Sequence, residues 1–347
     1  MPHTIKTLAD LFQVTTNKIR FYEKKGLLKP IRDPNNDYRL YEETDVLCLQ
    51  RILLYRALGL SIDQIKTILT SDTDKSPLDQ FNQLWELTNH EIHRLTGIRN
   101  TLEQVLDTLY ESTAETQSEQ ISQLIQNNQT SYQIRTQWKD QWNFNDWAAH
   151  YDDTINRMKD QDGIYQSYDN LLDTVASHCP LNQTSPPLLL DIGIGTGNLS
   201  KRLLDKGARV IGVDQSREML AIAKRKLPQL KVRLGDFMNL PFDNGTFQVI
   251  ASTYAFHHLK KQEKEIALDE MIRVLKPHGS IVIGDMMFES NAEKKRLMAT
   301  MTQEQINEVN DEFYSVIVHL SEFTTAKGLT LTKLQIDDIC WVVKIEK

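Results

Sequence analysis

The sequence predicts a multidomain protein in which an all-α head with a small β wing and a long helix precede an α/β domain. Helix-spaced apolar residues fill residues 1–75, and apolar side chains then recur every seven residues over 78–110. From about residue 186 onward, short apolar segments alternate with stretches of helical periodicity. A chain of 347 residues is long enough for each part to bury its own core.

Composition limits the class of protein. Hydrophobic residues make up 40% of the chain and charged residues 25%, and no apolar run approaches the roughly 20 residues that span a bilayer. The N-terminus lacks the charged and apolar regions of a signal peptide, so we expect a cytoplasmic protein without membrane contact. Three widely spaced cysteines, Cys48, Cys179 and Cys340, suit a reducing compartment and offer no metal-ligand spacing, so no metal site is expected.

Charge is unevenly distributed along the chain. The net charge is −7, but residues 1–70 hold 11 Lys and Arg against 8 Asp and Glu, a balance of +3, so the remainder carries −10. A basic head on an acidic body suits nucleic-acid contact confined to one end. An imbalance of this size also arises by chance, so charge alone does not decide between these interpretations.

Four short helices and a two-stranded wing are expected in the head. Apolar spacing places the helices over 4–12, 15–25, 44–58 and 61–70. Gly26 ends the second helix as a C-cap residue, and Ser61 with Gln64 forms a capping box at the fourth. Between the second and third helices, IRDPNNDYRLY is rich in turn formers and ends in an alternating segment, which predicts the wing.

A single long helix with a coiled-coil seam is predicted over 76–112. The seam has two rows at heptad spacing. The first row is Phe81, Thr88, Leu95, Leu102 and Leu109. The second row is Trp85, Ile92 and Leu106, interrupted by Arg99. An isolated helix cannot bury such a seam, so it packs against its own chain or, as we favour, forms a homodimer through 78–110. Residues 113–140 are polar and predict a linker, either irregular or helical.

An α/β domain is predicted over 141–347. LLLDI, RVIGVD, KVRLGD, FQVIAST and SIVIGDM are strand candidates, and helical periodicity lies between them over 197–206, 216–227 and 262–275. This alternation predicts a largely parallel sheet covered by helices. Lys276-Pro277-His278-Gly279 predicts a turn before the last of these strands, and the C-terminal segment predicts a β-hairpin.

A glycine motif follows the first of these strands. Gly193, Gly195 and Gly197 let the backbone turn sharply and approach a ligand beside a helix N-terminus. Asp191 opens the motif, and Asp214, 23 residues later, ends the next strand, where a carboxylate can accept both hydroxyls of a ribose. Dinucleotide-binding dehydrogenases share that last feature, but their phosphate-binding spacing is GxGxxG rather than DxGxGxG.

The spacing DxGxGxG resembles motif I of class I S-adenosylmethionine (S-adenosyl-L-methionine, AdoMet)-dependent methyltransferases, whose domain is Rossmann-like. FNDWAAHYDD, DIGIGTGNL, GDF and STYAFHHL, in order over about 143–347, resemble the YrrT-like methyltransferases. The resemblance implies that Asp191 and the glycines hold the methionine part of AdoMet and Asp214 its ribose. It implies a wider cofactor set of Gln215, Met219, Asp236, Phe237 and Ser252, with Trp147 and Tyr151 either folding over the cofactor or only packing.

Two adjacent histidines are the candidates for work on the methyl acceptor. His257 and His258 follow the fourth strand, where this fold places acceptor-side residues. Adjacent residues on an extended backbone cannot both face one site, so a packing role is the alternative. The chain lacks the NPPY-like signature of amino-methylating nucleic-acid enzymes and the Pro-Cys of cytosine C5 enzymes, so a small-molecule acceptor is expected.

The head resembles the winged helix-turn-helix of the MerR family over about 1–70, in VTTNKIRFYEKKGLLKP followed by NNDYRLY. The second helix and the wing present the expected contacts to double-stranded promoter DNA, which are Thr16, Lys18, Arg20, Tyr22, Lys24, Tyr38 and Arg39. For Tyr22 a role in the core is the alternative. Asp37 stands where the family's wing turn has Gly, and Asp tolerates a left-handed backbone. The long helix matches the family's antiparallel dimer helix, without the flanking cysteines of metal-sensing members.

These features together predict a DNA-binding transcriptional regulator whose C-terminal domain binds AdoMet and transfers its methyl group to a small molecule. The alternative is a regulator that senses AdoMet or S-adenosylhomocysteine (AdoHcy) without turnover, because both would keep every cofactor residue. A third interpretation makes the head a protein-interaction module that does not bind DNA.

Overall fold

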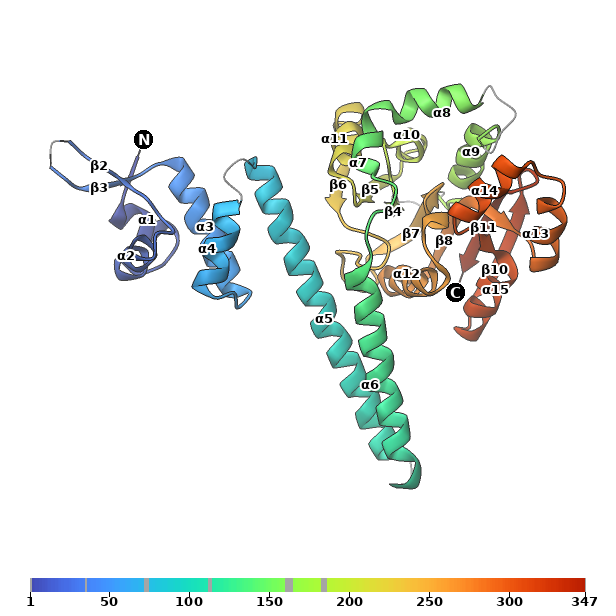
Figure 1. Ribbon diagram of the computed structural model, residues 1–347, viewed down its shortest axis with the longest axis horizontal. Coiled ribbons are helices and arrows are strands. Elements are labelled where there is room, and N and C mark those ends of the chain that lie inside the picture. Colours follow the sequence, from blue (N-terminus) through green and yellow to red (C-terminus); the bar gives the residue numbers. More distant parts are fainter. Residues whose placement is uncertain are drawn as a thin grey trace. The chain divides into compact units, whose positions relative to one another are not determined.

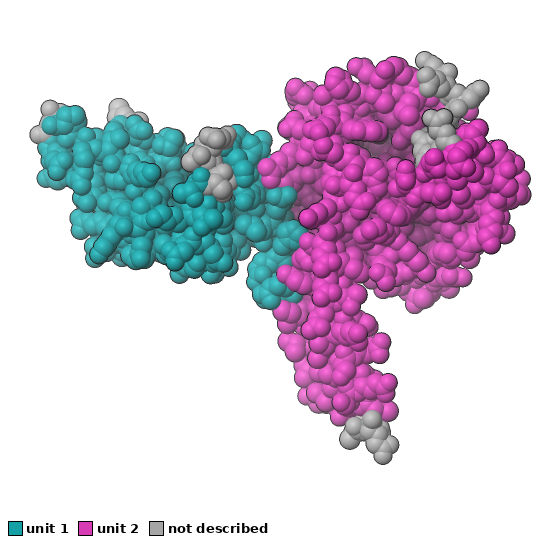
Figure 2. All heavy atoms as spheres, viewed as in Figure 1, with its two compact units in different colours: residues 1–95 teal, residues 96–347 magenta. Residues whose placement is uncertain are grey.

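The computed structural model describes residues 2–34, 36–71, 75–111, 114–159, 165–181 and 186–346. The chain forms two compact units, residues 1–95 and 96–347 (Figure 2). The boundary between them lies within one helix, α5 (Pro77–Glu111), so the first unit ends and the second begins in helical structure.

Within its described residues, the first unit combines short helices, three short strands and the first part of α5 (Figure 1). Its elements are β1 (His3–Thr4), α1 (Ile5–Leu11), α2 (Thr16–Lys24), β2 (Ile31–Arg32), β3 (Arg39–Tyr41), α3 (Glu43–Ala57) and α4 (Ile62–Ser71). The strands pair antiparallel in the order β1-β3-β2, so the expected wing gains a third strand from the N-terminal segment. Its core draws on every helix, through Leu8, Ile19, Leu49, Ile52, Ile65 and Leu84.

The expected signals at helix ends and in the wing are confirmed. Gly26, which follows α2, has a φ of +74°. The Gln64 backbone N–H donates to Ser61 Oγ at 3.2 Å, and the Ser61 N–H donates to Gln64 Oε1 at 2.8 Å, as a capping box requires. Asp37 has a φ of +57°, the left-handed conformation expected of it. Asn35, part of the segment that predicted the wing, lies outside the described residues.

Most predicted elements of the α/β domain are confirmed to within a few residues. They are β4 (Leu188–Ile192), α10 (Asn198–Asp205), β5 (Arg209–Asp214), α11 (Arg217–Lys226), β6 (Lys231–Leu234), β7 (Phe247–Thr253), α12 (Lys261–Val274), β8 (Leu275–Phe288), β10 (Thr330–Gln335) and β11 (Cys340–Glu346). Further elements were not predicted, namely α7 (Phe144–Trp147), η1 (Ala148–His150), α8 (Tyr151–Lys159), α9 (Tyr168–His178), η2 (Phe256–His258), α13 (Asn291–Met298), α14 (Gln303–Asp311), β9 (Ser315–Val316) and α15 (Ile317–Ala326).

The sheet of this domain has the order β6-β5-β4-β7-β8-β11-β10, with β9 beside β8. The pairs from β6 to β8 are parallel, and β11 runs antiparallel to both β8 and β10. The strand order reverses between β4 and β7, because the chain first builds outward through β5 and β6 and then crosses back. In this architecture, ligands bind at the carboxyl ends of the strands beside such a reversal.

The expected turn before β8 is part of the strand. β8 begins at Leu275, and its pairing with β7 shifts register between the pairs Phe247–Leu275 and Val249–Ser280. The intervening residues therefore bulge out of the ladder, with His278 at a φ of +61°. A bulge accommodates Pro277, which has no N–H to donate to a neighbouring strand.

The polar segment after α5 is a helix rather than an irregular linker. α6 (Ala114–Gln137) runs back along α5 (Figure 1). Asn128 joins the two helices, because its Nδ2 donates to the Gly97 carbonyl oxygen at 2.7 Å and to Thr101 Oγ1 at 2.5 Å. This pairing leaves part of the predicted seam uncovered in the single chain, since between 47% and 57% of the residue surface stays exposed at Leu95, Leu102, Leu106 and Leu109.

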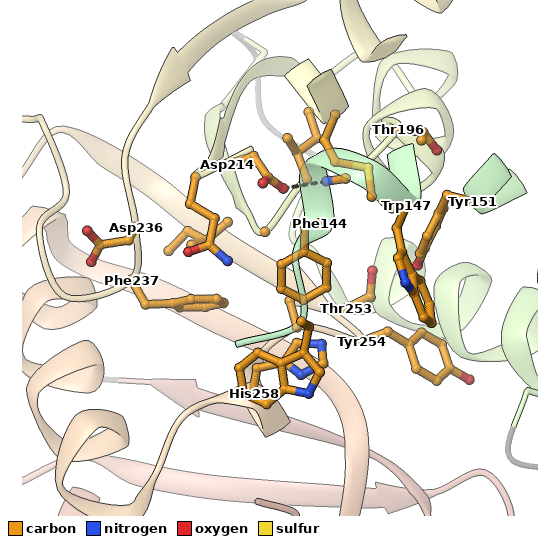
Figure 3. A pocket seen from close by; sticks show the side chains of 18 of the residues that line it. Phe144, Trp147, Tyr151, Thr196, Asp214, Asp236, Phe237, Thr253, Tyr254 and His258 are labelled. Atoms are coloured by element: carbon orange, nitrogen blue, oxygen red, sulfur yellow. Dashed lines mark hydrogen bonds between the residues drawn. The ribbon is translucent and has the colours of Figure 1, made fainter. Parts of the chain in front are cut away.

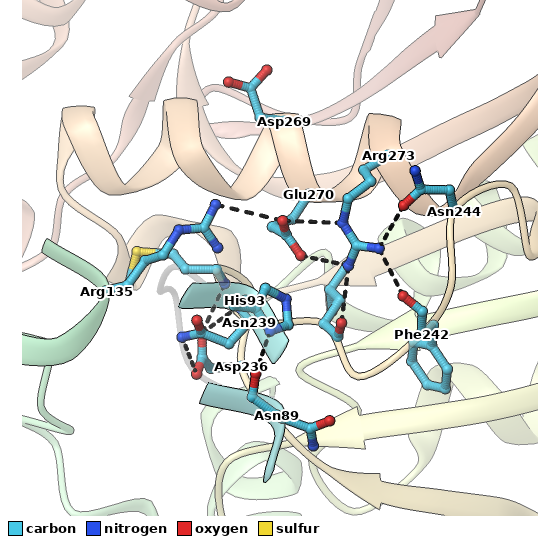
Figure 4. A network of polar contacts seen from close by, with 12 residues as sticks. Asn89, His93, Arg135, Asp236, Asn239, Phe242, Asn244, Asp269, Glu270 and Arg273 are labelled. Carbon is cyan, nitrogen blue, oxygen red and sulfur yellow. Dashed lines mark hydrogen bonds and ion pairs between the residues drawn. The ribbon is translucent and has the colours of Figure 1, made fainter. Parts of the chain in front are cut away.

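A buried ion-pair network fixes the end of α6 to the α/β domain (Figure 4). Glu270 of α12 lies 2.7 Å from Arg273 and 3.5 Å from Arg135 of α6. Arg273 also donates to the carbonyl oxygens of Leu240 and Phe242, at 3.0 and 2.7 Å. Because a buried carboxylate is costly without partners, these two guanidinium groups make the junction specific.

The core of the second unit lies between the sheet and its helices. Buried residues of β4, β7, β8, β11 and α12 form it, among them Leu190, Phe247, Ile250, Met271, Ile281, Ile283 and Val343. Across the ranges that the structure describes, no helix combines the length and the apolar character that crossing a membrane requires.

Candidate functional site

A cavity lies at the carboxyl ends of β4, β5, β6 and β7, beside the reversal of strand order (Figure 3). It holds about 1140 Å³, including the part that is open to solvent. The loops after these strands line one side of the cavity. Aromatic side chains from the part of the chain before β4 line the other side. The predicted cofactor residues that line it are Trp147, Tyr151, Gly193, Gly195, Asp214, Gln215, Met219, Asp236 and Phe237.

The glycine motif forms the turn between β4 and α10. Gly193, Gly195 and Gly197 have φ angles of +67°, +53° and +89°, which other residues rarely adopt. A Cβ at Gly193 would lie only 2.5 Å from the Cβ of Ala255, whereas a Cβ at Gly195 would have no neighbour within 4 Å. The backbone at Gly195 is therefore open to close approach by a ligand.

Asp214 ends β5 and is tied to the glycine turn. Its Oδ2 accepts the N–H of Gly195 and its Oδ1 accepts the N–H of Ser216, both at 2.8 Å. Burial raises the pKa of Asp214 to about 6, although these two hydrogen bonds oppose the change. Each carboxylate oxygen keeps a second lone pair, so Asp214 can accept further hydroxyl donors from the cavity.

Asp191 does not line the cavity, which corrects its predicted contact with the ligand. Its side chain is 1% exposed, and its Oδ2 accepts the Ser200 hydroxyl of α10 at 2.7 Å. Burial, together with nearby Asp214, raises the pKa of Asp191 to about 7. The carboxylate therefore fixes the beginning of α10 against the end of β4.

Three other residues predicted to contact the cofactor support the cavity wall rather than offering their side chains to a ligand. Gly197 is the N-cap of α10, and Ser252 is fully buried in β7; neither is part of the cavity lining. Asp236 does line the cavity, but its Oδ1 accepts the N–H groups of Met238 and Asn239 at 2.7 and 3.0 Å. Its carboxylate thus shapes the turn that presents Phe237, the more direct candidate for contact with a flat ring.

The segment before α8 lies over the cavity. The Ser216 hydroxyl donates to Asn145 Oδ1 at 2.9 Å, which ties α7 to the N-cap of α11. Trp142 and Phe144 place their ring centroids 4.4 and 4.9 Å from that of His258, and Figure 3 shows Phe144 projecting among the labelled cavity residues. The sequence predicted Trp147 and Tyr151 in this segment but missed Trp142 and Phe144.

Sequence reasoning also missed the polar residues that hold α8 in place. Asp152 accepts the Thr196 hydroxyl at 2.6 Å, the Asn198 amide at 3.0 Å and the Lys226 ammonium at 2.7 Å. The motif FNDWAAHYDD contains this residue, but its partners are far apart in the sequence. Aromatic residues beside it complete the wall, namely Tyr165, Tyr168 and Tyr254.

The two candidate histidines lie in different surroundings. His257 is 1% exposed and pairs with Asp285 through Nδ1 at 2.6 Å, outside the cavity lining, so it takes the packing position that was the alternative for one of the two histidines. His258 lines the cavity, with Nδ1 2.9 Å from Oε2 of Glu312. Burial and the neighbouring His257 lower the pKa of His258 to about 4, so its ring is neutral near pH 7.

The predicted DNA-contacting residues of the first unit also divide into two groups. The side chains of Lys18, Arg20, Lys24 and Tyr38 are exposed, and Thr16 is half-buried. Tyr22 is 2% exposed within the core of the head, so it takes the core role that was the alternative to its contact with DNA. The remaining cations lie along α2, the helix expected to enter a major groove.

Arg39 of the wing pairs with a side chain of α2. Its Nε donates to Oε2 of Glu23 at 2.7 Å, and the hydroxyl of Tyr41 donates to the other oxygen of the same carboxylate. A carboxylate of α2 therefore already pairs with Arg39, and the contact of Arg39 with the DNA backbone stays a prediction. Glu23 holds the wing against α2.

Residues 189–279 match the family described as methyltransferase domain, and residues 3–72 match the family described as MerR HTH family regulatory protein. An uncharacterised methyltransferase of Oceanobacillus iheyensis is 35% identical over 210 residues, which cover 59% of this chain and 95% of that protein. The uncharacterised methyltransferase YrrT of Bacillus subtilis is 33% identical over 211 residues, covering 59% and 96%.

Among solved structures, magnesium protoporphyrin IX methyltransferase from Synechocystis PCC 6803, with bound SAH, aligns at 14% identity and a TM-score of 0.47. That alignment covers 60% of this chain and all of the other. The sequence matches span nearly the whole length of each relative, and the MerR match covers residues 3–72 of the head. The chain belongs to the YrrT-like methyltransferase family and carries a MerR-type helix-turn-helix ahead of its methyltransferase domain.

Proposed function

We propose that this chain is a DNA-bound transcriptional regulator whose C-terminal domain binds AdoMet and transfers its methyl group to a small-molecule acceptor. The observation that carries the proposal is the Asp214 carboxylate, which the Gly195 amide holds at the edge of the cavity. Since the strand order reverses beside this carboxylate, it stands where a nucleoside binds in such sheets.

The described residues fit the parts of AdoMet. The Asp214 carboxylate has lone pairs for two ribose hydroxyls, and the apolar faces of Phe237 and Met219 suit a flat adenine ring. The open backbone at Gly195 leaves room for the methionine part. The rings of Trp147 and Tyr151 suit a positively charged sulfur, because aromatic faces attract cations.

Bound AdoMet would supply a methyl group on a positively charged sulfur; the chain's own task is alignment. Asp214 orients the ribose, while the aromatic segment with Trp142 and Phe144 excludes water from the acceptor side. His258, neutral near pH 7, can exchange a hydrogen bond with an acceptor hydroxyl, thiol or amine. With a pKa of about 4 it is a weak base, so it orients the acceptor rather than deprotonating it.

A calorimetric titration of AdoMet into the full chain tests the cofactor assignment. Asp214→Ala should weaken binding about 10- to 100-fold, because it removes charge-assisted hydrogen bonds worth roughly 1.5–3 kcal/mol. Asp205→Ala is the matched control, since Asp205 is an exposed acid on α10 that pairs only with Lys201 among the contacts described. Unchanged affinity in a folded Asp214→Ala protein would refute the site, and no binding by the wild type would refute the proposal.

Turnover separates an enzyme from a sensor. The AdoMet-loaded chain is incubated with panels of small thiols, phenols and amines, and AdoHcy release is measured. Release that needs one acceptor class supports methyl transfer, whereas tight AdoMet binding without turnover across the panels supports the sensing alternative. Repeating the AdoMet titration with promoter DNA present reports any coupling, because such an effect must be reciprocal.

The head supports the DNA-binding part of the proposal through the exposed cations Lys18, Arg20 and Lys24 along α2. Binding to a promoter fragment should weaken steeply with salt, because phosphate contacts release counterions. Salt-insensitive or absent binding would favour a protein-interaction module. The uncovered apolar residues of α5 support a homodimer through 78–110, which sedimentation of the full chain tests.

A further inference from the structure

Three potential ligand atoms converge where η2 meets the segment after α14. They belong to His257, His258 and Glu312, and they all lie within 4.8 Å of one another. His258 Nδ1 is 2.9 Å and His257 Nε2 is 3.6 Å from Oε2 of Glu312. Ligand atoms bound tetrahedrally at zinc–nitrogen distances of 2.0–2.1 Å stand about 3.3 Å apart, so this spacing suits one metal ion.

His257 is held in the tautomer that a metal requires. Its Nδ1 is 2.6 Å from Oδ1 of Asp285, and its backbone N–H donates to Oδ2 of the same carboxylate at 2.9 Å. An ionised carboxylate only accepts hydrogen bonds, so Nδ1 carries the proton and Nε2 presents its lone pair toward Glu312. A carboxylate behind a histidine is the usual support of a metal-binding imidazole.

The backbone carrying Glu312 is fixed to the backbone carrying the histidines. The N–H of Phe313 donates to the His257 carbonyl oxygen at 3.1 Å. Buried Lys264 donates to the carbonyl oxygens of both Leu259 and Phe313, and so clamps the residues that follow His258 and Glu312. The three ligand positions are therefore built into the fold before any ion binds.

Apart from each other, two of these ligand atoms have few partners in the protein. Nδ1 of His258 and Oε2 of Glu312 are both buried and 2.9 Å apart, and within the described residues no further hydrogen-bond partner reaches either atom. Buried polar atoms with so few partners lose their hydration without full compensation. A cation placed between them would satisfy both.

We propose that His257 Nε2, His258 Nδ1 and Glu312 Oε2 bind a divalent first-row transition-metal ion at the edge of the cavity. Two imidazoles and one carboxylate form a donor set that suits zinc and its neighbours better than calcium or magnesium. The cysteine spacing gave no indication of this site, because its ligands contain no cysteine and one of them comes from a distant segment. The expectation of a protein without a metal site is therefore replaced by this proposal.

The position of the site indicates how the ion is used. His258 and Glu312 line the cavity, so three protein ligands leave a coordination position on the cavity side. A hydroxyl or thiol acceptor bound there would lose its proton to solvent and present an anionic oxygen or sulfur to the methyl group. This use rests on the proposed methyl transfer, whereas the metal site itself stands independently of it.

Metal binding is measured on the full chain after removal of bound ions with a chelator. Cobalt(II) titration should give saturable visible absorption at one ion per chain, and zinc should displace it. His258→Ala and Glu312→Gln should each weaken cobalt binding by at least about tenfold. His90→Ala, which removes an exposed histidine from the first unit, should leave it unchanged.

The absence of saturable cobalt or zinc binding by the wild type would overturn the proposal. So would binding that both ligand variants retain, and so would binding that His90→Ala reduces as much as the ligand variants do. Zinc-dependent elevation of the melting temperature in the wild type, lost in Glu312→Gln, checks the result without spectroscopy. Because Glu312→Gln keeps the side-chain shape, its melting temperature without metal reports whether it folds. AdoMet titration of the metal-free chain separates failure of this site from failure of the proposed function.

Discussion

Replacing Asp191 with Asn should change the pH dependence of stability while leaving AdoMet affinity nearly intact. Asp191 is buried behind the glycine turn and accepts the Ser200 hydroxyl at 2.7 Å, a hydrogen bond that the amide oxygen of Asn can also accept. The substitution therefore keeps the shape of the site and removes only the ionisable group.

The magnitude follows from the pKa of the buried carboxyl. Burial raises the pKa of Asp191 from 3.8 to about 7. Because the folded pKa lies above the unfolded one, the unfolded chain loses its proton first as the pH rises. Stability of the wild type therefore falls between about pH 4 and pH 7, by up to about 4 kcal/mol, and the Asn variant escapes this loss.

Urea unfolding of both proteins at about pH 4 and about pH 8 measures the effect. Tryptophan fluorescence reports mainly on the second unit, because every tryptophan except Trp85 lies there. The variant's free energy of unfolding, relative to the wild type, should rise by several kcal/mol from the lower to the higher pH. An equal difference at both pH values would show that burial of Asp191 is not the cause. A loss of AdoMet affinity beyond about tenfold would place Asp191 in contact with the ligand.

Three further substitutions test other parts of the chain. Arg20→Ala should weaken promoter binding and lower its salt dependence by about one phosphate contact, without changing AdoMet affinity; a joint loss would contradict independent sites. Gly193→Ala should destabilise the second unit by roughly 1–3 kcal/mol and reduce AdoMet binding, because its Cβ would meet Ala255 at 2.5 Å, whereas Gly207→Ala has open space and serves as the control for a positive φ. Asn128→Ala should lower the melting temperature of the α5–α6 pair, at a cost of about 1–2 kcal/mol; an unchanged circular-dichroism melt would show that apolar contacts alone hold it.

Features that depend on neighbouring residues were predictable from the sequence. The capping box of Ser61 and Gln64, the positive φ of Gly26 and the left-handed Asp37 all follow from local backbone requirements. The glycine turn and Asp214 were predictable for the same reason, since a strand end and a tight turn specify which residue types fit.

Features that depend on distant packing were not predictable from one sequence. Local spacing allowed Tyr22 either a DNA contact or a place in the core, and only the fold shows that its ring is in the core. The motif around Asp191 predicts a contact with the ligand, but the side chain is buried beneath α10. Glu312 belongs to no local sequence pattern that links it to His258. The polar composition of α6 conceals its helix, because its packing depends on a few contacts such as that of Asn128.

Residues 142–147 lie over the cavity and would limit the rate at which it exchanges its contents. A molecule beneath them has to wait until Asn145 separates from Ser216 and the ring of Trp142 moves off His258. Because these contacts must break first, both entry and departure of the molecule are slowed. Its residence time can therefore be long even where its affinity is ordinary. A ligand held in this way would exchange more slowly than its affinity alone implies.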